Sequence, residues 1–383
     1  MRILAVDVGT GTQDIYLFDS RLAVENGFKM VLPSPTMIVR RKIQETTKKR
    51  LPIVLSGVTM GGGPSHWAVE DHLAAGLAVY ATPDAARSFN DDLDFLREQG
   101  ITVVSEEEAQ ALGNSNPSFR LQDFDYAAIR QAFQAFGVSL DDLAAVAVAV
   151  FDHGAAPPGY SDRKFRFEYI EERVLAENRL SAFAFPSDRI PAIMTRMQAV
   201  AHSAGQVEAP LMLMDTAPAA VLGATLDPRL RSQARPMVAN IGNFHTLAFR
   251  LGPTGIEGVF EHHTGFMDRE KLEFLFREFA AGRLSDEFVF ADQGHGARIL
   301  APTPLPLNGH HPALTVVGPR RGMMAGSGLQ PYFAAPFGDM MLVGCFGLLA
   351  AAAQVFPELA GRIKASLFQA GDQGSPPWEL DSA

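Results

Sequence analysis

Residues Val6 to Gln13 read VDVGTGTQ, and residues Ala239 to Thr246, far along the chain, read ANIGNFHT. Each segment contains the end of an apolar strand, a polar residue, a turn with glycine and the start of a second strand. Turns of this kind present consecutive backbone N–H groups to an anion, and glycine lets the backbone approach it closely. One such turn is compatible with a plain hairpin, but two of them at the starts of two α/β units predict a site that grips a polyphosphate.

The rest of the chain alternates between apolar runs and helical patterns. The unbroken apolar run 144–151 is typical of a buried strand, and Glu168 to Gly205 is predicted to be mostly helical. Short strands separated by helices predict a parallel β-α-β arrangement at residues 53–55, 77–80 and 101–104. The fold class is therefore α/β, with length enough for two domains or more.

The composition narrows the classes of function. The chain has 383 residues and a net charge of −10, which argues against sequence-independent nucleic-acid binding, because that needs a basic face. The longest apolar run, Met340 to Ala353, is too short to span a bilayer, and the apolar start of the chain ends at Asp7, unlike a signal peptide. The single cysteine, Cys345, excludes an intrachain disulfide. We therefore expect a soluble cytoplasmic protein without a nucleic-acid or membrane partner.

Three carboxylates follow apolar strands and are candidates for chemistry: Asp7, Asp152 and Asp215. Asp7 stands beside the first glycine turn, where it could bind a metal ion or cap the turn; hard oxygen ligands suit Mg²⁺. Asp152 could face a cleft from the end of its strand. Asp215 precedes a helix that contains Pro218, so it could act in catalysis, cap the helix, or do both.

Five histidines lie in loop-like sequence next to glycine, acid or threonine: His153, His245, His262, His263 and His295. Imidazole binds metals or phosphate and transfers protons near neutral pH. Each of these histidines alone fits a loop or core position. As a group with Asp152 they could form a metal site, although no His-Glu-x-x-His spacing supports it.

The order of segments resembles the actin/Hsp70/sugar-kinase ATPase superfamily over nearly the whole chain. The matching segments are two phosphate loops at 6–13 and 238–251, two connectors at 201–227 and 336–353, and an adenosine loop at 315–321. The resemblance implies a two-domain actin-like ATPase (ribonuclease H-like) fold with an interdomain cleft for ATP and Mg²⁺. It implies a first domain at 1–235 with an α/β insertion, completed by 336–383, and a second, smaller domain at 236–335. Gly344 and Gly347 would allow close helix approach.

The resemblance also implies roles for single residues. Asp7 would hold Mg²⁺ through water, Asp215 would join the metal site and orient the attacking water, and Asp152 is a second catalytic candidate. Asn240 stands where the superfamily usually has Asp, and Phe244 and His245 interrupt its glycine-rich run, so nucleotide binding is better supported than turnover. The nucleotide-binding set comprises Asp7, Gly9, Thr10, Gly11, Thr12, Gln13, Asn240, Gly242, Asn243, His245, Thr246, Gly318, Pro319 and Arg320.

Several short motifs resemble one prokaryotic family still more closely. They are DHG at 152–154, NIGN at 240–243, EHHTG at 261–265, GHGA at 294–297 and GDMM at 338–341. That family carries the label of a pyruvate formate-lyase activating enzyme. Enzymes with that activity hold an iron–sulfur cluster on a Cys-x3-Cys-x2-Cys motif, which a chain with one cysteine cannot supply.

Three functions remain open from the sequence. The first is an ATPase or phosphotransferase with Mg-ATP in the cleft, where catalysis is mostly positioning and charge neutralisation. The second is a nucleotide-responsive activator or binding protein without turnover, which signals to a partner. The third is a metal-dependent hydrolase that uses the His/Asp cluster. The sequence does not specify the acceptor substrate or the protein partner.

We predict that the chain holds no iron–sulfur cluster and does not cleave S-adenosylmethionine, because such clusters typically need several thiolates and this chain offers one. Anaerobic purification followed by iron and acid-labile sulfide analysis checks this. A brown protein with stoichiometric iron and sulfide would contradict it.

Overall fold

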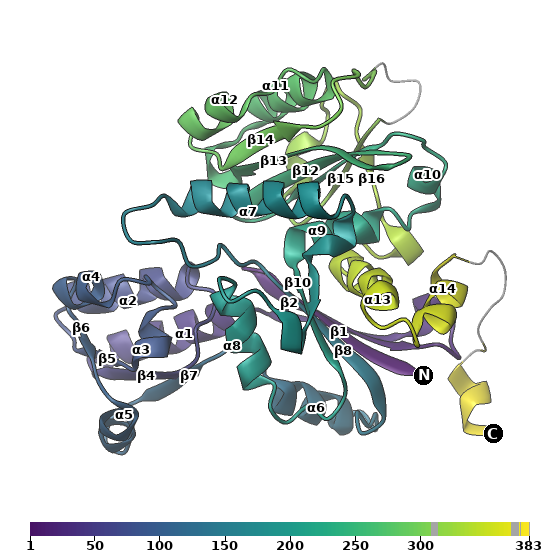
Figure 1. Ribbon diagram of the computed structural model, residues 1–383. Helices are drawn as coiled ribbons and strands as arrows, with labels where there is room; N and C mark the ends of the chain where they lie inside the picture. The colour runs from purple at the N-terminus through teal and green to yellow at the C-terminus, as the bar shows by residue number, and fades with distance from the viewer. Residues whose placement is uncertain (308–312, 369–374, 376, 383) are drawn as a thin grey trace.

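The computed structural model describes residues 1–307, 313–368, 375 and 377–382, which form three β-sheets (Figure 1). The first sheet has the strand order β3-β2-β1-β8-β10-β9, and the second has the order β14-β13-β12-β11-β15-β16. The strands of the first sheet are β1 (Arg2–Val8), β2 (Thr12–Asp19), β3 (Phe28–Pro33), β8 (Leu143–Val150), β9 (Ala184–Pro186) and β10 (Leu211–Asp215). Those of the second are β11 (Met237–Ile241), β12 (His245–Gly252), β13 (Gly255–His263), β14 (Gly296–Ile299), β15 (Leu314–Val317) and β16 (Tyr332–Phe333).

The two sheets share one plan. In the first, β1, β2 and β3 form an antiparallel meander, and β8 and β10 then add in parallel beside β1. In the second, β11, β12 and β13 form the meander, and β15 and β16 add in parallel beside β11. This ribonuclease H-like plan occurs twice, so the two-domain actin-like ATPase fold expected from the sequence is confirmed.

A third, all-parallel sheet is inserted between β3 and β8 and has the order β6-β5-β4-β7. Its strands are β4 (Ile53–Gly57), β5 (Val79–Ala81), β6 (Ile101–Val103) and β7 (Ser118–Leu121). Its helices are α1 (Pro35–Lys48), α2 (Pro64–Ala74), α3 (Pro83–Ala86), α4 (Leu93–Glu98) and α5 (Glu106–Gly113). The domain limits 1–235 with 336–383, and 236–335, remain a prediction.

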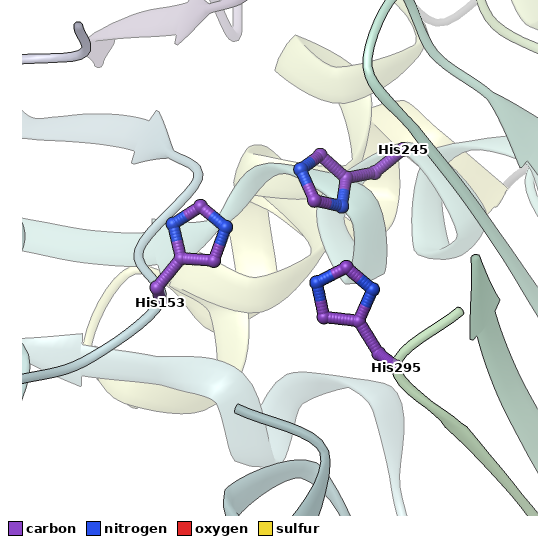
Figure 2. A group of neighbouring side chains, drawn as sticks. All are labelled: His153, His245 and His295. Carbon is purple, nitrogen blue, oxygen red and sulfur yellow. The ribbon is translucent and has the colours of Figure 1, made fainter. Parts of the chain in front are cut away.

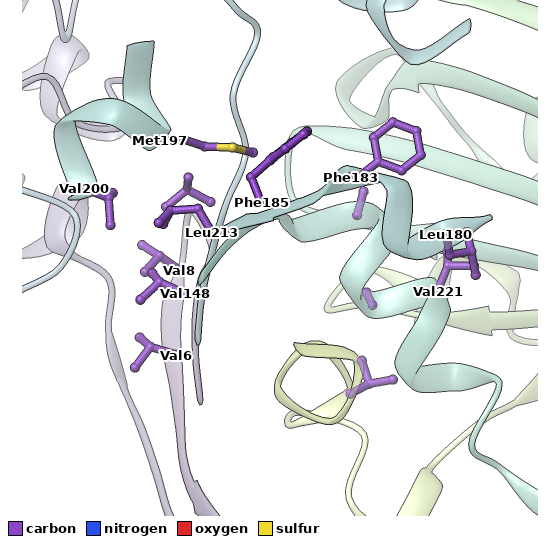
Figure 3. Close-up of a cluster of buried hydrophobic side chains, with 14 of the residues drawn as sticks. Val6, Val8, Val148, Leu180, Phe183, Phe185, Met197, Val200, Leu213 and Val221 are labelled. Atoms are coloured by element: carbon purple, nitrogen blue, oxygen red, sulfur yellow. The ribbon is translucent and has the colours of Figure 1, made fainter. Parts of the chain in front are cut away.

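Alternation along β1 separates two cores, because successive side chains of a strand point to opposite faces. Leu4, Val6 and Val8 pack toward α6 (Tyr126–Ala135), α7 (Asp162–Ala176) and α8 (Thr195–Ser203), in the cluster that Figure 3 shows. Ile3 and Ala5 pack on the opposite face, toward α13 (Val343–Val355) and α14 (Ala360–Phe368). The remaining helices are α9 (Thr216–Ala224), α10 (Pro228–Arg231), α11 (Arg269–Ala280) and α12 (Asp286–Ala291).

Helices α9 and α13 lie against each other with their backbones in contact. A Cβ atom at Gly347 would overlap the carbonyl oxygen of Ala219, and one at Gly223 would overlap that of Val343. The close approach predicted for Gly347 is therefore present. Gly344 instead faces the carboxylate of Asp7, which a Cβ atom would overlap.

The segment from Glu168 to Gly205 is less helical than its sequence pattern predicts. Helix α7 ends at Ala176, and the chain then forms β9, which pairs antiparallel with the edge of β10. This pairing is a long-range contact that local periodicity does not report. No helix in the described part of the chain is both long and apolar enough to cross a membrane.

We predict that Gly347→Ala lowers the free energy of unfolding by about 1–3 kcal/mol or more, because the new methyl group must push two helix backbones apart. Urea unfolding measures the effect. Gly361→Ala in α14 is the matched control, since nothing lies within 4 Å of its Cβ position, and there alanine favours the helix by about 0.5–1 kcal/mol. Equal stabilities of the two variants would contradict the backbone contact.

Candidate functional site

A cavity of about 1150 Å³ lies where the three sheets meet. Its walls include the turn after β1, the turn after β11, the loop Gly61–Gly63 of the insertion and the residues after β8. This volume is large for a small-molecule site, for which about 300–1,000 Å³ is usual. The cavity therefore has room for a nucleotide.

The two glycine turns have the same backbone closure. The N–H of Gly9 donates to the carbonyl oxygen of Thr12 at 2.9 Å, and the N–H of Gly242 donates to that of His245 at 2.9 Å. The turns face each other, because a Cβ atom at Gly11 would lie 3.0 Å from Nδ2 of Asn243. The two segments that the sequence analysis pairs are therefore neighbours in the structure.

Phe244 and His245, which interrupt the glycine-rich run of the second turn, both have structural partners. A Cβ atom at Gly63 would meet the Phe244 ring at 2.6 Å, so Phe244 packs on the insertion loop. The Phe244 ring also contacts Trp67 edge-on, with 5.7 Å between centroids. His245 stacks on Phe151 with its centroid 4.0 Å away. The second turn therefore contacts both the insertion and the residues that follow β8.

Two buried carboxylates lie at the base of the first turn. Asp7 and Asp14 are directly opposite each other in the β1–β2 ladder, and both line the cavity. Thr216 Oγ1 donates to Oδ1 of Asp7 at 2.6 Å, whereas Oδ1 of Asp14 is buried without a hydrogen-bond partner among the described residues. Asp14 was not a sequence candidate, because only the strand register brings it to Asp7.

Burial raises the pKa of both carboxyl groups. For Asp7 the pKa rises to about 6, with the Thr216 hydroxyl partly offsetting the desolvation. For Asp14 the pKa rises to about 8, because of burial and the negative charge of Asp7. A buried pair of this kind favours a bound cation or proton over two free negative charges.

The loop at Gly318 is tied to the second turn. Gly318 has φ +95°, and a Cβ atom there would overlap Oδ1 of Asn240. The N–H of Arg320 donates to the carbonyl oxygen of Ile241 at 3.0 Å. Gly318 and Pro319 line the cavity, whereas Arg320 is exposed and does not.

Two residues of the predicted nucleotide-binding set point away from the cavity lining. Gln13 Nε2 donates to the carbonyl oxygen of Pro33 at 3.1 Å. Thr246 is fully buried, and its hydroxyl shares a 2.9 Å hydrogen bond with that of Thr264. These side chains hold the two hairpins in place. Apart from these two residues and Arg320, all members of the set line the cavity: Asp7, Gly9, Thr10, Gly11, Thr12, Asn240, Gly242, Asn243, His245, Gly318 and Pro319.

Asp152 and Asp215, the catalytic candidates, both have their oxygens engaged by the protein. Asp152 accepts from the N–H groups of Gly154 and Met197 at 2.9 and 2.8 Å. Asp215 caps α9 through the N–H of Ala217 at 3.1 Å and pairs with Arg166 at 2.6 Å. Asp215 is not in the cavity wall, so its geometry favours the cap over contact with a nucleophile or metal.

Arg166 was not singled out from the sequence, yet it connects the two six-stranded sheets. Its side chain is 1% exposed. Nη1 donates to Asp215 at the end of β10, and Nε donates to Glu261 of β13 at 3.0 Å. Its guanidinium lies 3.9 Å from the ring centroid of Phe151. A charged residue in a helix usually indicates a solvated face, so the sequence holds no signal for this role.

Three of the five loop histidines come together: His153, His245 and His295. They point toward one another in Figure 2. His263 lies beside them, with its ring 4.6 Å from that of His295. His262 points to the other side of β13, where Nε2 lies 3.1 Å from Oδ2 of Asp292. Asp152 is not in this group; it shapes the loop that presents His153.

The family model described as "Putative pyruvate format-lyase activating enzyme (DUF1786)" matches residues 60–323. No curated protein matches the sequence. Among solved structures, the chain is similar to an ethanolamine utilization protein EutJ from Carboxydothermus hydrogenoformans, with 12% identity over 91% of this chain and 89% of that one, and a TM-score of 0.31.

Two proteins of the ROK family also match. The first is a transcriptional regulator, a homolog of the E. coli MLC protein, with 9% identity and a TM-score of 0.26. The second is a hexokinase from Thermus thermophilus, with 10% identity and a TM-score of 0.22. Each match covers 67% of this chain, but only 37% and 47% of the regulator and the hexokinase, so the chain spans less than half the length of either.

We predict that Asp14→Asn changes the pH dependence of stability in the absence of divalent cations. The pKa of Asp14 is about 3.9 in the unfolded chain and about 8 in the folded one, so the folded state binds the extra proton. Its contribution to stability is present below the unfolded pKa and is lost as pH rises toward 8, by at most about 1.4 kcal/mol per pH unit. The wild type should therefore lose stability relative to Asp14→Asn over this range.

Urea unfolding of both proteins at about pH 5 and about pH 8 measures the difference. Parallel pH profiles for wild type and variant would contradict the raised pKa and the burial that causes it.

Proposed function

The chain belongs to this DUF1786 family, and we propose that it binds a Mg²⁺-nucleotide, with ATP as the expected ligand, in the cavity between its two glycine turns. The observation behind the proposal is the matched pair of turns, closed by the same hydrogen bond and facing each other across one cavity. An ATPase or phosphotransferase of the actin-like superfamily is the activity that this arrangement supports.

The turns fit a phosphate chain. Gly9, Gly11 and Gly242 let the backbone approach an anion without side-chain interference, and the hydroxyls of Thr10 and Thr12 add polar groups on the same side of the cavity. The opposed turns would hold phosphates from two sides. Gly318 and Pro319, at the edge of the same cavity, would then lie beside the adenosine.

Asp7 and Asp14 fit Mg²⁺. Carboxylate oxygens are the hard ligands that this ion uses, and the unpartnered Oδ1 of Asp14 is a buried acceptor that a cation or its water would satisfy. When bound, Mg²⁺ would neutralise phosphate charge. The first turn of α13 packs on the Asp7 carboxylate, since only glycine fits at position 344, so any shift of Asp7 is transmitted directly to that helix.

A second function, nucleotide-responsive binding without turnover, is favoured by one further observation. The catalytic candidates Asp152 and Asp215 are engaged in backbone hydrogen bonds and an ion pair. In that case nucleotide binding would change the packing of α9 on α13, and a protein partner would recognise the changed surface. ATP hydrolysis measured beside binding separates the two functions.

We predict that Mg-ATP or Mg-ADP raises the melting temperature of the protein, with a gain of about 2.7 kcal/mol at a hundredfold the dissociation constant. Asp7→Asn keeps the hydrogen bond from Thr216 but removes the charge, so it should abolish the Mg²⁺-dependent part of the shift. Asp94→Asn is the matched control, because Asp94 is an exposed carboxylate of α4 in the insertion and belongs to neither turn.

Thermal shift with nucleotide, with and without Mg²⁺, provides the measurement. No shift with any nucleotide at saturating concentration, or equal loss in Asp7→Asn and Asp94→Asn, would reject the proposal.

A further inference from the structure

The three convergent histidines come from both halves of the molecule. His153 follows β8 of the first sheet, whereas His245 begins β12 and His295 precedes β14 of the second. One possible ligand atom from each ring lies within 4.8 Å of the others (Figure 2). Three nitrogen donors on three separate elements surround one point where the two sheets meet.

His295 provides independent evidence for a ligand at this point. Its side chain is 1% exposed, and neither ring nitrogen has a hydrogen-bond partner among the described residues. A buried polar atom without a partner costs about 1–3 kcal/mol. A metal ion bound between the rings would satisfy one of these two nitrogens, whereas a purely structural role for His295 satisfies neither.

The charges around the rings favour a cation. Nδ1 of His245 lies 3.1 Å from Oε1 of Glu261, off the line of a hydrogen bond. Glu261 shares Arg166 with Asp215, so this buried network has two carboxylates for one guanidinium. Burial favours a protonated Glu261, but the Arg166 guanidinium holds the pKa of that carboxyl well below its usual range. His245 therefore lies beside an ionised carboxylate.

Burial of the rings also opposes their charged form. Burial lowers the pKa of His295 to about 3 and also lowers the pKa of His245. His153 faces the cleft and lies deep within it. Desolvation lowers its pKa well below the usual value, and the neighbouring His245 adds to this effect. Neutral imidazole has a free lone pair on one nitrogen, and metal affinity requires that form.

We propose that His153, His245 and His295 bind one divalent transition-metal ion of the Zn²⁺ class. Three imidazoles suit zinc rather than magnesium or calcium, which prefer oxygen ligands. Three protein ligands leave a fourth position for water, as in catalytic rather than structural zinc sites, and here that position faces the cleft through His153 and His245. This site goes beyond the nucleotide proposal, because it uses imidazole nitrogens instead of the carboxylates of Asp7 and Asp14 and binds another ion.

Metal binding at this point would hold the two sheets together. The ligand atoms of the three rings lie within 4.8 Å of one another, and the ligand nitrogens of tetrahedral zinc lie about 3.3 Å apart. His153 follows a strand of the first sheet, whereas His245 and His295 belong to the second. One metal ion bound to all three rings would therefore link the two halves of the molecule.

Titration of metal-free protein with Zn²⁺ by calorimetry, and with Co²⁺ by visible absorption, tests the site. We expect one equivalent bound and the intense absorption of tetrahedral Co²⁺. His153→Gln and His295→Gln should each weaken binding by roughly 100-fold or more, since even outer-shell substitutions at metal sites cost 10–100-fold. His202→Gln, at an exposed position of α8, is the matched control and should bind as wild type does.

His153→Gln keeps the test decisive if the buried variant fails to fold, because His153 is exposed to the cleft. Absence of stoichiometric binding to wild type, or unchanged affinity in His153→Gln, would overturn the proposal. The Mg-ATP thermal shift of His153→Gln is measured in parallel: a retained shift with lost Zn²⁺ binding shows that the two sites are separate.

Discussion

One buried arginine connects the two halves of this molecule. Arg166 donates to Asp215 at the end of β10 and to Glu261 near the end of β13, while its guanidinium rests on Phe151. Removal of one partner from a buried ion pair typically costs about 3–5 kcal/mol, because the other charge is left without compensation. The relative position of the two sheets, and hence the shape of the cleft, depends on this network. It also sets the negative charge behind His245.

A second constraint acts at the opposite side of the first sheet, where glycine allows α9 and α13 to touch along their backbones. Helix α9 begins at Asp215, an Arg166 partner, and α13 begins beside Asp7. The helix contact thus joins the arginine network to the first glycine turn through very few residues. The carboxylate of Asp7 packs on α13 at Gly344, and α13 packs on α9 at Gly347. This is a physical route from the cavity to the interface between the two halves.

The sequence was most informative where a feature is local. Neighbouring residues determine the two glycine turns, the α9 cap at Asp215 and the close approach at Gly347. The structure places each of these features as expected. Asp14, Arg166 and β9 were missed because strand register and side-chain burial arise from contacts distant in sequence. The sequence grouped the histidines with Asp152, whereas the structure places Glu261 beside His245 and uses Asp152 to shape the loop that carries His153. Phe244 and His245, read as departures from a phosphate loop, have partners in the insertion and in the histidine group.

In the proposed function, the two turns hold one nucleotide between them. A crystal structure with Mg²⁺ and a non-hydrolysable ATP analogue provides the decisive test. We expect phosphates between Gly9–Thr12 and Gly242–Asn243, with the metal on the side of Asp7 and Asp14. An analogue bound elsewhere, or a cleft that stays empty in crystals grown with saturating analogue, would contradict it.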